Sequence, residues 1–225
     1  MKKLSIASII VIAMLLTIGT VYGNTFTYTP TPNDLGDLDH GYYYYWQITD
    51  PTLQMALQSE QIIGATLTFK NIWDWTVERN DQLYIHLEDT RPVGGTQIGS
   101  SVRRYIDNQP SSDVMGKDAF GSTGQIIDIW NDPNGGKARN FDLIYDLAFV
   151  LPYGINPDRN LLDELTTYSS DGIFGIGIDP DCHYYNNGVT LTINTQPVGV
   201  PEPSVFFLFG SGLVGLAFFS LRRKV

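Results

Sequence analysis

A dense polar segment near the end of the central part of the chain offers the oxygen atoms that bind a divalent cation. Asp179, Asp181 and Asn186 lie within eight residues of one another and supply carboxylate and amide oxygens, which Ca²⁺ accepts in flexible geometry. The same composition is typical of turns, and Asn187-Gly188 before an alternating segment is a strong hairpin signal. A calcium site and a simple turn therefore both remain open, and no other cofactor is indicated.

Two aromatic groups suggest contact with sugars. Trp73 and Trp75 flank Asp74, and residues 42–46 hold four tyrosines and a tryptophan. Sugar rings stack on such faces while neighbouring acids and amides bond the hydroxyl groups. Alternate residues of a strand point to opposite faces, so about half of the 42–46 run belongs to a core. Trp73 and Trp75, at a predicted strand end, are the better candidates for glycan binding.

The other reactive residues form no enzyme signature. Cys182 is the single cysteine, which excludes an intrachain disulfide, and we interpret it as a buried structural thiol. The three histidines lack the HxH, HExxH and CxxC spacings of zinc sites, so we interpret them as isolated structural residues. No Gly-x-Ser-x-Gly elbow is present, and no acid pair is singled out for glycoside hydrolysis. The sequence predicts a protein that is not an enzyme, with a secreted hydrolase as the least favoured alternative.

The segments that must position these residues alternate apolar and polar side chains. Period two over Ile63–Phe69 and Leu83–Glu88 predicts half-buried strands. Further candidate strands are 26–29, 42–48, 125–130, 141–151, 173–178 and 189–194. Residues 157–168 suggest one short helix, and 91–124 should be mostly loop with at most one strand. Many short strands separated by turn signals predict an all-β fold, an antiparallel β-sandwich of the jelly-roll type.

Both ends of the chain carry apolar segments next to cations. Residues 1–23 combine two lysines, an apolar run and small residues before Asn24, which predicts a signal peptide cut by signal peptidase. Residues 205–221 contain no charge and precede Arg222, Arg223 and Lys224, which predicts a transmembrane helix with a cytoplasmic stop. The expected organisation is a signal peptide (1–23), an extracellular domain (24–198, the body) and a C-terminal tail (199–225).

The body is strongly acidic once the two ends are set aside. It holds 9 basic and 23 acidic side chains, a net charge of -14. Such a surface repels phosphate groups, so we expect no nucleic acid partner. Divalent cations are favoured.

The C-terminal tail resembles the PEP-CTERM sorting signal. Pro201-Glu202-Pro203 leads into the glycine-containing apolar segment, and the basic cluster follows. Prolines on both sides of Glu202 favour extended backbone. The resemblance implies that an exosortase, a membrane-embedded cysteine peptidase, recognises these three residues as substrate in a Gram-negative bacterium that makes extracellular polysaccharide.

Export and sorting together predict the destination of the protein. We expect an inner-membrane intermediate held by the tail, followed by release to the outer surface or the biofilm matrix, where extracellular polysaccharide would be a partner. The alternative function is a carbohydrate-binding adhesin, with or without a dependence on Ca²⁺.

Overall fold

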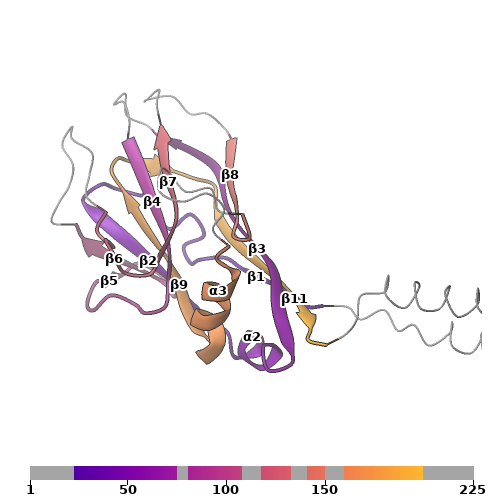
Figure 1. Ribbon diagram of the computed structural model, residues 1–225. Helices are drawn as coiled ribbons and strands as arrows, with labels where there is room; N and C mark the ends of the chain where they lie inside the picture. The colour runs from indigo at the N-terminus through magenta and orange to yellow at the C-terminus, as the bar shows by residue number, and fades with distance from the viewer. Residues whose placement is uncertain (1–22, 75–80, 108–117, 133–140, 150–159, 200–225) are drawn as a thin grey trace, which may run out of the picture. The chain divides into compact units, whose positions relative to one another are not determined.

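The computed structural model describes residues 23–74, 81–107, 118–132, 141–149 and 160–199 (Figure 1). Residues Asn24–Gln196 form one compact unit. The predicted transmembrane helix and all of the signal peptide before Gly23 lie outside the described residues. No helix in the described part of the chain has the length and hydrophobicity needed to cross a bilayer.

The compact unit is built from two antiparallel sheets, as the sequence predicts. The first contains β1 (Thr25–Tyr28), β3 (Glu60–Asp74), β8 (Phe141–Asp146), β10 (Tyr184–Tyr185) and β11 (Val189–Pro197). Its order is β1-β11-β3-β10, and β8 also pairs with β3. The second contains β2 (Tyr42–Thr49), β4 (Asp81–Glu88), β5 (Thr96–Gln97), β6 (Val102–Ile106), β7 (Gln125–Asp132) and β9 (Ile173–Pro180). Its order is β5-β6-β2-β9-β4-β7.

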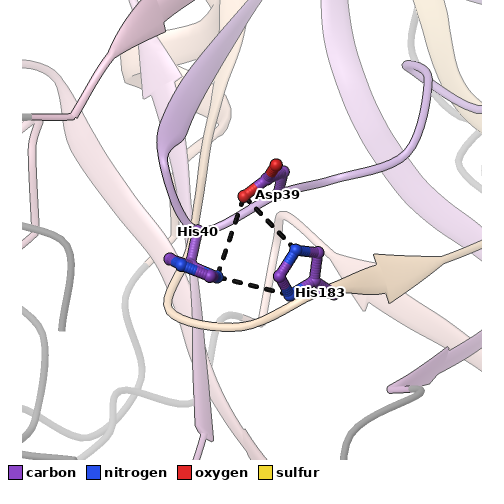
Figure 2. Close-up of side chains that lie close together, drawn as sticks. All are labelled: Asp39, His40 and His183. Carbon is purple, nitrogen blue, oxygen red and sulfur yellow. Dashed lines mark hydrogen bonds and ion pairs between the residues drawn. The ribbon is translucent and has the colours of Figure 1, made fainter. Parts of the chain in front are cut away.

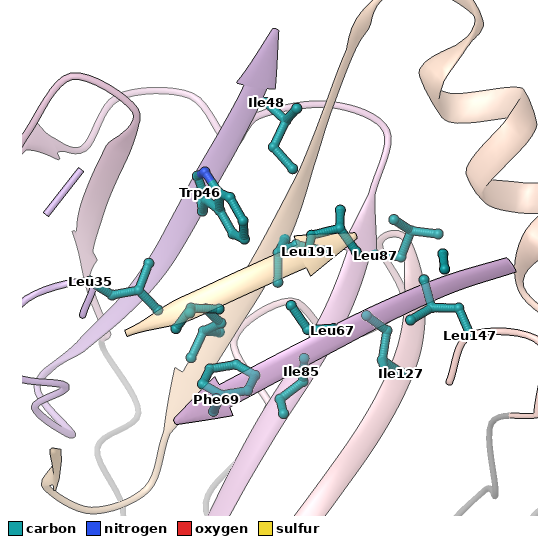
Figure 3. Packing of buried hydrophobic residues seen from close by; sticks show 14 of the residues in the cluster. Leu35, Trp46, Ile48, Leu67, Phe69, Ile85, Leu87, Ile127, Leu147 and Leu191 are labelled. Carbon is teal, nitrogen blue, oxygen red and sulfur yellow. The ribbon is translucent and has the colours of Figure 1, made fainter. Parts of the chain in front are cut away.

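The hydrophobic core contains side chains from both sheets (Figure 3). In β3, Leu67 and Phe69 are buried, whereas Ile63 on the same strand is 49% exposed. Trp46 from β2 and Leu191 from β11 belong to the same cluster. The period-two pattern therefore identifies the inner face of β3 from Ala65 to Phe69, but it is wrong at Ile63, where the neighbouring Ile62 is buried instead.

The outer face of the second sheet is more buried than the sequence suggests. Tyr84, His86 and Glu88 occupy the polar positions of β4, yet each is at most 6% exposed. The prediction that β4 is half-buried is therefore wrong. Aromatic rings cover this face: Tyr43 stacks on Tyr105 with centroids 4.8 Å apart, and Phe120 lies 5.1 Å from the His86 ring.

Two short helices and a single 3-10 turn accompany the described strands. Helix α2 (Pro51–Ala56) begins after Asp50, whose side chain accepts a 2.7 Å hydrogen bond from the Thr52 N–H, and Pro51 suits the first helical turn. Helix α3 (Leu162–Tyr168) lies within the predicted 157–168 helix, whose first residues fall outside the described ones, and η1 (Ser169–Asp171) follows it. Helix α2 was not predicted from the sequence, although Asp50-Pro51 is a helix-start signal.

Two segments depart from the sequence prediction. The described part of residues 91–124 contains two strands, β5 and β6, rather than at most one. Strand β5 is only two residues long, too short to show a period. Strand β8 ends at Asp146 and not at Leu151, because the Asp146 carboxylate accepts a hydrogen bond from the Ala148 N–H and its carbonyl accepts one from the Phe149 N–H, which closes a turn.

Candidate functional site

An open groove of about 410 Å³ lies where the segment before β2 meets β6 and β10. Its polar lining, which defines the groove here, consists of Asp37, Asp39, Tyr44, Arg104, His183 and Tyr185. The guanidinium of Arg104 lies 4.5 Å from the centre of the Tyr42 ring. The groove thus combines acids, a cation and an aromatic ring, the mixture expected of a site for a small polar ligand.

The backbone brings two distant segments together at this groove. Leu38 and Tyr184 form an isolated antiparallel bridge with hydrogen bonds in both directions, of 3.2 Å and 2.9 Å. Both residues are buried, so water does not compete for these bonds. The bridge places Asp39 and His40, which follow Leu38, beside His183, which precedes Tyr184.

Asp39, His40 and His183 form a compact cluster at the groove (Figure 2). The Nδ1 atoms of the two imidazoles are 3.3 Å apart, and their ring planes are nearly perpendicular at 83°. Asp39 Oδ1 lies 3.7 Å from His40 Nδ1 and 3.4 Å from His183 Nε2. Asp39 and His40 are about 40% exposed, and His183 is 25% exposed. The interpretation of His40 and His183 as isolated residues is therefore wrong.

A second cluster of potential ligands lies in the interior. Asp74, Asp81 and Cys182 present their ligand atoms close together, and Cys182 Sγ is 3.6 Å from Asp74 Oδ1. Cys182 is 1% exposed, which confirms the prediction of a buried thiol. Within the described residues, two groups of three or more His, Cys, Asp or Glu side chains lie close enough to hold a metal ion, and they are these two clusters.

A third polar group lies on the covered outer face of the second sheet; we call His86, Glu88, Asp118 and Asp179 the outer-face cluster. His86 Nε2 is 3.0 Å from Asp118 Oδ2, and His86 Nδ1 is 3.6 Å from Glu88 Oε1. The Ala119 N–H donates a 2.7 Å hydrogen bond to Asp179 Oδ2. His86, Glu88 and Asp179 are at most 2% exposed.

Burial changes the protonation of this cluster. It raises the pKa of Glu88 to about 7, an effect that the charge of His86 and a hydrogen bond from Thr123 partly offset. It also raises the pKa of Asp179 to about 8; the Ala119 N–H opposes this increase, whereas the nearby carboxylates of Asp107, Asp118 and Asp181 add to it. The two carboxyl groups therefore hold protons more tightly than exposed acids do.

The residues predicted to bind calcium have other roles in the described structure. Asp179 belongs to the outer-face cluster, and the nearby charge of Asp181 contributes to its raised pKa. Asn186 is engaged in a turn: its amide donates to the Asp34 carbonyl, and its Oδ1 accepts from the Gly188 N–H, both at 2.9 Å. Asn186 thus closes a local turn, but the predicted hairpin at Asn187-Gly188 is wrong, because β10 and β11 are not neighbours in the sheet and β10 pairs with β3. The calcium site stays a prediction.

Only one of the two tryptophans proposed to bind glycans can be placed. Trp73 is half-buried near the end of β3, and its ring lies 4.7 Å from that of Tyr185, a residue of the groove. Trp75 lies outside the described residues. Glycan binding by these residues stays a prediction.

Sequence reasoning missed the Asp39–His40–His183 cluster because its two parts are 143 residues apart in the chain. No spacing rule detects such a pair, since a non-local bridge creates it. For the outer-face cluster a weak signal existed: His86 and Glu88 alternate with the apolar residues of β4.

Comparison with known proteins places the C-terminal tail. The PEP-CTERM protein-sorting motif matches residues 199–224. The tail is a PEP-CTERM sorting motif. The match contains Pro201, Glu202 and Pro203 and the basic residues Arg222, Arg223 and Lys224, all outside the described residues.

The PEP-CTERM motif indicates how the protein is exported and sorted. It implies export, membrane-associated sorting in a Gram-negative bacterium and processing by an exosortase. The motif thus indicates an exosortase-sorted, secreted protein.

Two solved structures resemble the chain distantly. A latent aurone synthase (polyphenol oxidase) from a natural source shares 10% identity at a TM-score of 0.33, over 77% of this chain and 28% of that one. The recombinantly expressed enzyme gives 9% identity and a TM-score of 0.31, over 76% and 28%. The chain therefore spans less than a third of these enzymes, and no inference about function follows at this level of likeness. Comparison with curated proteins finds no match.

Proposed function

We propose that this PEP-CTERM protein is a non-enzymatic component of the outer cell surface or of the extracellular polysaccharide matrix. The observation that carries the proposal is the sorting motif at residues 199–224, which follows a compact unit that ends at Gln196. The signal peptide predicted at residues 1–23 supplies the matching entry into the export pathway. The body is then the part that works outside the cell.

We also propose that the body is a jelly roll, a scaffold that presents loops and grooves and carries no chemistry of its own. Strands β1, β11, β3 and β8 are neighbours in one sheet, and β2, β9, β4 and β7 are neighbours in the other. The chain passes from one sheet to the other between β1 and β2, β2 and β3, and β3 and β4, as expected for a double-sheet roll. Because many functions share this architecture, the proposal for function rests on the motif.

Burial of the outer-face cluster supports a non-enzymatic role. Two acids that hydrolyse a glycosidic bond must face a cleft that admits the substrate. Glu88 and Asp179, the carboxylates with the most strongly raised pKa values among the described acids, are covered by Phe120 and its neighbours and are at most 2% exposed. A substrate would have to displace this cover to reach them.

Processing of the exported protein tests the sorting proposal. The native host would produce the full chain and a variant with Pro201, Glu202 and Pro203 replaced by alanine, with Ser204→Ala as the matched control. Intact-mass spectrometry of the extracellular fraction should show that the parent and the control begin at Asn24 and have lost the C-terminal apolar segment. The triple variant should accumulate in the membrane fraction with its tail. A secreted parent protein that still ends at Val225 would refute the proposal.

A carbohydrate-binding adhesin is the second candidate, and one observation favours it. The ring pair of Trp73 and Tyr185 adjoins the groove that Asp37, Asp39 and Arg104 line. An aromatic surface beside charged groups suits a sugar, whose ring stacks while its hydroxyl groups form hydrogen bonds.

A glycan panel separates the two candidates. The parent, Trp73→Ala, Trp75→Ala and Tyr185→Ala would be assayed against neutral and acidic polysaccharides, with and without a chelator. Phe149→Ala is the control, because this aromatic side chain is 73% exposed and is not part of the groove. Loss of binding in the groove variants alone would support the adhesin, and unchanged binding in all of them would exclude the aromatic site.

A further inference from the structure

We propose that Asp39, His40 and His183 form a binding site for a divalent transition-metal ion of the zinc class at the rim of the groove. The proposal rests on the geometry of this cluster and is independent of the proposed function. The three donor atoms all lie within 4.8 Å of one another, so one ion reaches all of them after small side-chain rotations.

The spacing of the two imidazoles fits a tetrahedral ion. Metal–nitrogen bonds of about 2.0–2.1 Å place neighbouring ligand atoms of a tetrahedron about 3.3 Å apart. The Nδ1 atoms of His40 and His183 are 3.3 Å apart. Asp39 Oδ1 lies 3.7 Å from His40 Nδ1, which is only slightly longer. Its 3.4 Å distance to His183 is measured to Nε2, the ring nitrogen that would not bind the ion.

A metal ion would also explain why the Nδ1 atoms of His40 and His183 lie so close together. Nδ1 to Nδ1 contact requires a proton on one imidazole and a lone pair on the other, and protonation of both rings gives repulsion. A metal ion accepts both lone pairs. Asp39 then supplies negative charge beside the ion, and the net charge of -14 on the body attracts cations to its surface.

The frame around the cluster is already rigid. The Tyr44 hydroxyl accepts a hydrogen bond from the Asp39 N–H at 3.0 Å and donates one to the Asp37 carbonyl at 2.9 Å. The Gly41 N–H donates a 2.9 Å hydrogen bond to Asp39 Oδ1, which orients the carboxylate as the hydrogen-bonded neighbours of metal ligands usually do. Together with the bridge between Leu38 and Tyr184, these bonds fix both ligand segments in the absence of an ion.

The ligand set identifies the class of ion. Two imidazoles and one carboxylate suit Zn²⁺ and its neighbours in the first transition series, whereas Ca²⁺ and Mg²⁺ take oxygen ligands. Three protein ligands leave at least one coordination position of a tetrahedral ion open. Asp39 and His183 line the groove, so an open position directed into it would take water or an oxygen atom of a bound molecule.

Metal titration of the full-length chain, purified in mild detergent and stripped with a chelator, tests the site. Zn²⁺ would be titrated against a chromogenic competitor, and Co²⁺ would be followed by the visible absorption that tetrahedral coordination intensifies. The parent should bind one ion at this site. His40→Ala and His183→Ala should each weaken binding at least about tenfold and abolish the Co²⁺ band, and Asp39→Asn should weaken binding by a similar factor.

Two matched controls locate the ion. Asp37→Asn removes an acid of the same groove that lies outside the cluster, and Cys182→Ser removes the thiol of the interior cluster. Both should bind Zn²⁺ as the parent does. Circular dichroism would verify folding; His40 is 40% exposed, so its alanine variant should fold even if that of His183 does not.

A parent protein that binds no Zn²⁺, or histidine variants that bind Zn²⁺ as tightly as the parent does, would overturn the proposal. Loss of binding in Cys182→Ser with retention in the His40 variant would assign the ion to the interior cluster and would overturn it equally.

Discussion

Replacing Glu88 by glutamine should change how the stability of the body depends on pH. Glu88 is 2% exposed, and burial raises its pKa from 4.5 to about 7. The folded protein therefore binds the Glu88 proton more tightly than the unfolded chain does. The stabilisation from this proton is fully present below the unfolded pKa and is lost as the pH rises through the folded pKa.

The size of the effect follows from the two pKa values. At about 1.4 kcal/mol for each pH unit, the difference amounts to about 3 kcal/mol. The free energy of unfolding of the parent should therefore fall by this order between about pH 5 and about pH 8 through Glu88 alone. Asp179, whose pKa is raised to about 8, acts in the same direction.

Denaturant unfolding across this pH range, followed by tryptophan fluorescence, measures the effect, because the fully buried Trp46 reports on the core. Glu88→Gln cannot ionise, so its free energy of unfolding should decline less steeply with pH than that of the parent. Asp163→Asn, which changes an exposed acid of helix α3 that does not act on Glu88, is the control and should keep the slope of the parent. A Glu88→Gln variant with the slope of the parent would refute the argument that burial controls this carboxyl group.

Two further predictions concern packing on the two faces of the sheets. Leu67→Ala should lower the free energy of unfolding by about 2–5 kcal/mol, because Leu67 is fully buried in the core, whereas Ile63→Ala, at a 49% exposed position of the same strand, should change it by less than about 0.5 kcal/mol. Denaturant titration measures both, and equal losses would contradict the difference in burial between these two side chains. Gly177→Ala should lower the free energy of unfolding by about 1–3 kcal/mol, since its added Cβ would lie 2.7 Å from the Phe120 ring. Thermal unfolding measures this loss, and a fully stable variant would show that Phe120 does not pack on Gly177.

The strands could be predicted because the alternation of apolar and polar residues that marks a strand is visible within a short stretch of sequence. Leu67 and Phe69 repeat with period two, and within a regular stretch of strand that period places their side chains on one face; it fails at Ile63, where Ile62 is buried instead. Helix α2 was also within reach of such reasoning, since Asp50 and Pro51 are adjacent start signals. By contrast, the two-residue strand β5 contains too few positions to show any period.

The polar sites could not be predicted, because non-local contacts create them. Both faces of the second sheet are covered. Gly175 and Gly177 have no side chains, which leaves room for the aromatic rings on the outer face; a Cβ on Gly175 would overlap the Tyr45 ring. Tyrosine occurs in cores and on surfaces alike, so its position in a pattern does not reveal such a cover. The meeting of His40 and His183 depends on the Leu38–Tyr184 bridge, which no segment of the sequence specifies by itself.

The pairing of the first and last strands has a consequence for the timing of folding. Strand β11 lies between β1 and β3, with Thr25 opposite Asn194, and the Thr195 N–H donates a hydrogen bond to the Asn24 carbonyl. The first sheet therefore lacks an interior strand until Pro197 has emerged from the export channel, only two residues before the sorting motif begins. The first sheet cannot be completed before β11 has been translocated. The arrival of the sorting motif and the completion of the fold thus become nearly simultaneous, so an exosortase that acts at Pro201–Pro203 meets a body that has just become able to fold.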